Sequence, residues 1–303
     1  MLLTPVRSSL LLLALATPFS IGCGDDPIEC VGHDCSGAAI NLPEGGEIRL
    51  ELIGQKDSPA ELRVGGWFAT EQTPATRPMP RPPADWRKAG SGLCADMRSN
   101  EIWPTGDPMS RTYADAGATL VMAGATGTPL TLNKAEDVED ELNNYHKIAY
   151  LASIDPRAVT VNTEYEVQLA GGADIAAQSL ETKLYLPENF ETSFPDMDAT
   201  VVIPHDQDFP FIWAAPPNVD AYSFAFAAFT DQIDPIVFCI GPNDGSMVVP
   251  KEMIDLLPPG GTVQLGVLNH RVEPMKINGG DRRIDLVAIN CKQSSYSIST
   301  DGL

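Results

Sequence analysis

The second half of the chain consists of short apolar runs that alternate with turn-forming sequences, and this spacing limits the possible folds more than any other feature. Six strand-like runs occur within about ninety residues, at 200–203, 210–214, 222–229, 235–240, 262–268 and 283–290. Clusters of proline, glycine and asparagine separate them, at 216–217, 243–245, 258–261 and 278–281. Short strands at this spacing are typical of a β-sandwich.

The first half also contains strand-like runs, together with one segment that has helical spacing. Residues 46–53 alternate apolar and charged side chains, and residues 62–69 follow as a partner strand. Further strands are expected at 117–123, 129–133, 158–161, 165–169 and 182–186. Asn133, with Glu136 three positions later, is typical of a helix N-terminus. Apolar residues then recur at helical spacing and predict an α-helix at about 134–151: Val138, Leu142, Tyr145 and Ala149.

Two polar or proline-rich stretches define the expected organisation. Residues 74–83 contain five prolines, a composition that favours extended polyproline geometry. We interpret this stretch as a surface loop inside the first domain, because residues 40–70 supply only two strands before it. Residues 187–198 are polar and turn-rich, and we place a domain boundary there. The predicted fold class is mainly β, with two β-sandwich-like domains at 40–190 and 199–303, the first of which carries the inserted helix.

The N-terminus has the layout of a secretory signal peptide at residues 1–22, in which Arg7 precedes an apolar run at 10–16. This run is shorter than the roughly twenty residues that a membrane-spanning helix needs. Ser20-Ile21-Gly22-Cys23 resembles the lipobox of bacterial lipoproteins, although that family usually has leucine at the position of Ser20. The resemblance implies a diacylglyceryl anchor on Cys23 and a tether at 23–39. Cleavage after Ala16 is the alternative, and it would leave a soluble exported protein.

Six cysteines fit export into an oxidising compartment. If Cys23 carries lipid, five remain, and an odd count leaves one thiol outside the intramolecular disulfides. We expect a disulfide between Cys239 and Cys291, because both lie in apolar strand-like runs of the same half. The other three cysteines can supply only one more bridge: Cys30, Cys35 and Cys94.

Aromatic placement in the second half also resembles a known family. Trp213 precedes a run with aromatic residues on one face, Tyr222, Phe224 and Phe226, and this pattern resembles the core of immunoglobulin-like and fibronectin type III domains. The resemblance implies an immunoglobulin-like sandwich over about residues 199–300. A lipobox followed by short β-sandwich domains is similar to surface lipoproteins of Gram-negative bacteria, which implies a cell-envelope location, with the outer membrane as our expectation.

The chain is strongly acidic, with a formal net charge of −21. Such a charge opposes binding to phosphate backbones, so nucleic acid is excluded as an expected partner. It also opposes contact with anionic lipid, so we expect contact with a membrane through the N-terminal anchor alone.

Motifs that would support catalysis are absent from the sequence: it has no G-x-S-x-G, Walker, H-E-x-x-H, C-x-x-C or dinucleotide-binding motif. The most site-like cluster is His205-Asp206-Gln207-Asp208, which we interpret as a polar turn in preference to a metal or acid/base loop. A zinc site built from Cys30, His33 and Cys35 lacks a second ligand pair at usable spacing. We therefore expect no metal and no cofactor.

The predicted function is that of a lipid-anchored cell-envelope protein with a structural, adhesive or binding role and no catalysis, whose partner would be another envelope protein or a glycan. One alternative is a carbohydrate-binding module that uses Trp86 and Trp103, which lie in loop-like sequence. The other is a polysaccharide hydrolase with acid/base residues among Glu101, Asp107, Asp206 and Asp208.

Overall fold

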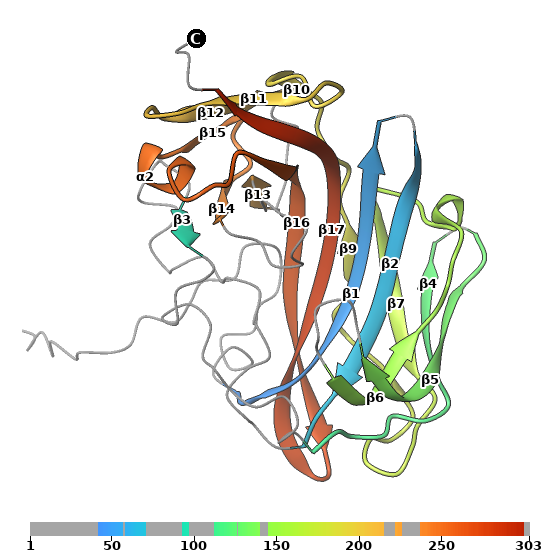
Figure 1. Cartoon of the computed structure of the whole chain (residues 1–303). Coiled ribbons are helices and arrows are strands. Elements are labelled where there is room, and N and C mark those ends of the chain that lie inside the picture. The colour runs from blue at the N-terminus through green and yellow to red at the C-terminus, as the bar shows by residue number, and fades with distance from the viewer. Residues whose placement is uncertain are drawn as a thin grey trace, which may run out of the picture.

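The protein is mainly β, as the sequence predicts, and its strands pack as a sandwich (Figure 1). The computed structural model describes residues 42–56, 58–70, 93–96, 112–125, 127–139, 145–214, 222–225 and 237–299. Within these residues, one 14-stranded sheet has the main path β3-β14-β13-β16-β17-β1-β2-β6-β5-β4-β7-β8, in which the last strand, β8, is Gln178–Ser179. In addition, β11 pairs with β17 and β9 pairs with β7. A second sheet has three strands in the order β10-β12-β15.

A long hairpin forms the middle of the large sheet. Its strands are β16 (Gly260–Ile277) and β17 (Gly280–Ser299), and they pair without a register shift from one end to the other. Asn278 and Gly279 connect them with φ values of 49° and 78°. Two-residue hairpin turns favour this left-handed backbone at both positions, which explains the Asn-Gly sequence.

The first hydrophobic core lies where the large sheet folds over itself. It begins with the predicted pair β1 (Glu44–Gln55) and β2 (Ser58–Phe68), which are antiparallel, while β1 also pairs in parallel with β17. Buried side chains such as Leu50 and Phe68 face others from the strands β4 (Thr119–Gly124), β5 (Leu130–Glu139), β7 (Thr163–Leu169) and β9 (Leu184–Leu186). Strict alternation of buried and exposed residues along β7 confirms the period-two prediction for this strand.

The second core lies between the large sheet and the three-stranded sheet, which we call the cap sheet. The cap sheet consists of β10 (Thr192–Phe194), β12 (Phe209–Trp213) and β15 (Ser246–Val249). Trp213 is buried as predicted and stacks on Phe190 with ring centroids 4.5 Å apart. From the large sheet, buried side chains of β14 (Val237–Pro242), of the N-terminal part of β16 and of β11 (Val201–Pro204), which pairs with β17, line this core. The backbone of β13 (Tyr222–Ala225) lies between β14 and β16. A short helix, α2 (Lys251–Ile254), follows Pro250.

Buried polar residues of β16 and β17 separate the two cores. The Glu273 carboxylate accepts hydrogen bonds from the backbone N–H groups of Glu181 and Thr182, both at 3.1 Å. The side-chain amide of Asn290 donates to the carbonyl of Pro187 at 3.0 Å. Residues near the expected domain boundary therefore pack on the middle of the hairpin, and one sheet runs through both cores. The division into two domains stays a prediction.

The predicted α-helix at 134–151 is wrong. In its place, β5 continues to Glu139 and β6 spans Tyr145–Leu151, and the two strands pair antiparallel. Leu130 and Leu132 are buried while Thr131 and Asn133 are exposed, so alternation marks the strand predicted at 129–133, and the structure continues this strand into the segment with helical spacing. Pairing of β5 with β4 on one edge and β6 on the other outweighs the local helix signal. The predicted strand at 158–161 is also wrong, since a 3₁₀ turn (Pro156–Ala158) and irregular backbone occupy it.

The predicted disulfide between Cys239 and Cys291 is wrong as well. Cys239 is bonded to Cys94, which lies directly opposite on β3 (Leu93–Asp96), the edge strand beside β14. Cys291 is a buried free thiol on β17, and it pairs with Gly266 of β16. Two strands, β13 and β16, separate β14 from β17, which explains why the cysteines of these strands do not bond.

Candidate functional site

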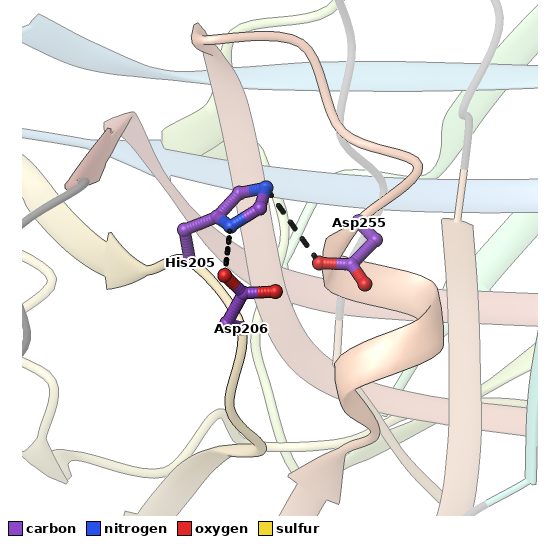
Figure 2. Close-up of side chains that lie close together, drawn as sticks. All are labelled: His205, Asp206 and Asp255. Carbon is purple, nitrogen blue, oxygen red and sulfur yellow. Dashed lines mark ion pairs between the residues drawn. The ribbon is translucent and has the colours of Figure 1, made fainter.

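The cluster His205-Asp206 lies in the turn between β11 and β12, and the fold brings Asp255, which follows helix α2, beside it (Figure 2). The His205 Nδ1 atom lies 2.9 Å from Asp206 Oδ2, and Nε2 lies 3.7 Å from Asp255 Oδ1. All three side chains are exposed. Within the described part of the chain, these are the residues that meet the spacing needed for a metal ion.

Lys251 completes this cluster. Its ammonium group lies 2.8 Å from Asp206 Oδ1 and 3.6 Å from Asp255 Oδ2. The backbone N–H of Lys251 also donates to Asp208 Oδ1 at 2.8 Å, so the turn before β12 is fastened to the first residue of α2. We call the four side chains of His205, Asp206, Lys251 and Asp255 the ion cluster.

The electrostatics of the ion cluster follow from these contacts. The hydrogen bond from the Lys251 ammonium, followed by that from His205, holds the pKa of the Asp206 carboxyl below its usual value. The same hydrogen bond to Asp206 raises the pKa of Lys251. Each partner therefore keeps its charge near neutral pH, as in an ordinary exposed ion pair.

This geometry does not suit a metal ion. The two carboxylates face different nitrogens of the His205 ring, whereas one ion binds only one of these nitrogens. Lys251 already supplies the positive charge between the carboxylates. The ion cluster thus fits a structural role better than an acid/base or metal role, in agreement with the interpretation of 205–208 as a polar turn.

A second histidine pair was not expected from the sequence, because the strand predicted at 262–268 ends before His270. In the structure, His270 lies in the middle of β16, with Nε2 2.7 Å from Asp285 Oδ1. Asp285 is buried and also accepts a hydrogen bond from Arg283. In the ion cluster, the i,i+4 spacing of Lys251 and Asp255 could have indicated their ion pair.

The remaining predicted site residues lie outside the described residues. They are the proposed anchor Cys23, the aromatic residues Trp86 and Trp103, the acids Glu101 and Asp107, and the rejected zinc set Cys30, His33 and Cys35. Among the helices of the described segments, none has the length and apolar character needed to cross a membrane.

Comparisons with known proteins give no family. No family model matches the chain, and no curated protein matches it. Among solved structures, the three fibronectin type III domains FN1–FN3 of chicken CNTN1 are 11% identical, and the match covers 86% of this chain and 69% of that one. The TM-score of 0.17 is too low for a shared fold, so we base the architecture on the strand pairings described above.

Proposed function

We propose that the chain is exported, is acylated on Cys23, and serves as a lipid-anchored structural or binding protein of the cell envelope, at the outer membrane, without catalysis. We further propose that its second unit is immunoglobulin-like. Its partners would be the membrane, through the anchor, and another envelope protein or a glycan.

The disulfide between Cys94 and Cys239 is the observation that carries this proposal. Disulfides persist in oxidising compartments and are rare in the reducing cytosol. A bridge within the folded part of the chain therefore supports export, and export is a prerequisite for acylation at a lipobox. The sequence Ser20-Ile21-Gly22-Cys23 then supplies the acceptor thiol.

The non-catalytic part of the proposal is supported by the ion cluster, which is the most site-like group of side chains in the described ranges. Both of its carboxylates pair with Lys251 and lie on the exposed surface. A general acid or base usually has a strongly shifted pKa in a desolvated pocket, and this group lacks that environment.

Mass spectrometry of the mature N-terminus, after expression of the full chain in a Gram-negative host, tests the proposal. We expect an N-terminal Cys23 that carries fatty acyl chains, in the membrane fraction. Cys23→Ser should release the chain from the membrane fraction, whereas the matched variant Cys30→Ser should remain acylated. A soluble wild-type product that begins elsewhere, or an intact Met1 in the cytosol, would overturn the proposal.

A further inference from the structure

The outward face of the cap sheet is apolar. Because side chains alternate along a strand, Phe209, Phe211 and Trp213 point into the second core, whereas Pro210 and Ile212 point outward. The register places Val248 of β15 beside Pro210, and Phe194 of β10 beside Ile212. We call Phe194, Pro210, Ile212, Ser246 and Val248 the cap face.

Exposure of large apolar side chains concentrates on this cap face. Phe194, Ile212 and Val248 are 39%, 43% and 42% exposed. Across the described segments, five large hydrophobic residues are exposed, and these three belong to one small sheet. The outer face of β7, by contrast, carries Glu164, Glu166 and Gln168. Three half-exposed large apolar side chains on one small sheet, in a protein with a charge of −21, favour a contact surface there.

The segments that carry the cap face are acidic. Residues 189–214 and 243–257, which contain the cap sheet and its flanking turns, have eight acidic residues and a single Lys or Arg, Lys251. All eight acids are exposed: Glu191, Asp196, Asp198, Asp206, Asp208, Asp244, Glu252 and Asp255. We call these eight residues the acidic rim.

The acidic rim is uneven. Since β12 runs antiparallel to β10 and β15, the start of β12 and the ends of the other two strands lie at the same end of the cap sheet. Four of the eight acids flank this end in the chain, next to the start of β12 or after the end of β15: Asp206, Asp208, Glu252 and Asp255. Asp198 instead precedes β11 and pairs with Lys292 of β17. Lys251 and Lys292 neutralise part of this charge, through Asp206 and Asp198. The net charge of the two segments, with Lys251 included, is −7.

We propose that the cap face binds a segment of a partner protein in which apolar side chains are flanked by lysine or arginine. The apolar side chains would cover Phe194, Ile212 and Val248, and the cations would face the acid-rich end of the cap sheet. Complementary charge favours this partner, whereas a second copy of the chain would bring two acidic rims together. Anionic lipid and nucleic acid are excluded by the same repulsion. This inference rests on the binding role proposed above but does not depend on the anchor.

Fluorescence anisotropy of the full chain with a labelled synthetic peptide tests the inference. The probe alternates lysine and leucine, and two control peptides replace every lysine by glutamate or every leucine by serine. We expect saturable binding of the lysine/leucine peptide that weakens at high salt, and no binding of either control. The double substitution Ile212→Thr and Val248→Thr, which keeps the β-branched shape, should weaken binding about tenfold or more, since it removes half-exposed apolar surface from the contact.

Two matched variants separate this contact from general attraction to an acidic protein. Leu151→Thr alters an apolar residue of β6 that is 40% exposed, and Glu164→Gln with Glu166→Gln removes two charges from β7. Both should bind the probe as the wild type does. Equal binding by the cap-face variant and the wild type would overturn the inference. A concentration-dependent dimer in sedimentation that Ile212→Thr abolishes would also overturn the inference, because a second copy of the chain would then occupy the cap face. Acylation of Cys23 is measured in a separate experiment, so failure of the lipid-anchor proposal and failure of the cap-face proposal can be told apart.

Discussion

Loss of the disulfide between Cys94 and Cys239 should cost this protein a large part of its stability. The bridge closes a loop with a sequence separation of 145 residues. In the chain-entropy model, a loop of this length stabilises the folded state by about 5 kcal/mol at 25 °C, because the bridge restricts the unfolded chain. Cys94→Ala is the best perturbation, since Cys94 is only partly buried and its removal leaves a smaller cavity than removal of Cys239.

Urea denaturation with and without a phosphine reductant measures this effect. The free energy of unfolding of the wild type should fall by about 5 kcal/mol in reductant. Cys94→Ala should have the lower free energy of unfolding already without reductant, and adding reductant should change it little. Cys291→Ala should keep the full response, because Cys291 is a free thiol. If Cys291→Ala abolished the response while Cys94→Ala kept it, the bridge would join Cys239 to Cys291 and the reasoning would be refuted. Peptide mapping under non-reducing conditions identifies the bonded pair directly.

Four further outcomes are expected. Tyr150→Phe should cost about 1–3 kcal/mol in urea denaturation, because the buried hydroxyl accepts a hydrogen bond from the Ala116 N–H at 2.7 Å. Burial raises the pKa of the Tyr150 hydroxyl to about 12, above the value of 10.0 in the unfolded chain. The stabilisation that comes with this shift is complete below pH 10 and is lost as the pH rises through 12. The free energy of unfolding should therefore fall over this range in pH-dependent denaturation. Gly266→Ala should cost about 1–3 kcal/mol, because the added Cβ would lie 2.4 Å from the carbonyl oxygen of Asn290. Excess Zn²⁺ should leave the melting temperature unchanged, because Lys251 already pairs with both carboxylates of the ion cluster.

Matched controls accompany these variants. Tyr185→Phe removes a hydroxyl that pairs with Asn162 at an exposed site, so it should cost much less than Tyr150→Phe, and an equal cost would contradict the role given to burial. Gly65→Ala places its Cβ 3.3 Å from the Cδ2 atom of Leu151, a side-chain tip that can move, and it should be tolerated better than Gly266→Ala. A zinc-dependent rise in melting temperature that His205→Ala removes would show that the ion cluster does bind metal.

Local alternation predicted much of the fold because it reports which face of a strand is buried. The pair β1 and β2, the strand β7 and the buried Trp213 follow from such patterns. The segment 134–151 has helical spacing, but it forms most of β5 and all of β6, which pair with each other, while the start of β5 pairs with β4. A helical period within one segment does not show that strand pairing with its neighbours is the more stable arrangement.

The length of the β16–β17 hairpin was underestimated for a related reason. His270, Arg271 and Glu273 have the polarity of a turn, and we therefore ended the strand before them. In the structure, these polar groups pair within the sheet or with residues 181–183, which lie about ninety positions earlier in the chain. A strand continues through such a polar stretch only where its polar side chains find hydrogen-bond partners elsewhere in the fold. A local sequence pattern does not show those partners. The same limit applies to the bridge from Cys94 to Cys239.

The parallel pairing of β1 with β17 has a consequence for orientation. Glu44 lies level with Arg283, near the tip of the long hairpin, whereas Tyr296 reaches the second core beside the cap sheet (Figure 1). The thirteen positions between Arg283 and Tyr296 correspond to about 40 Å along an extended strand. A chain tethered through its N-terminus would hold the hairpin tip toward the bilayer and raise the cap sheet well clear of the lipid headgroups, so a partner could approach it from solution.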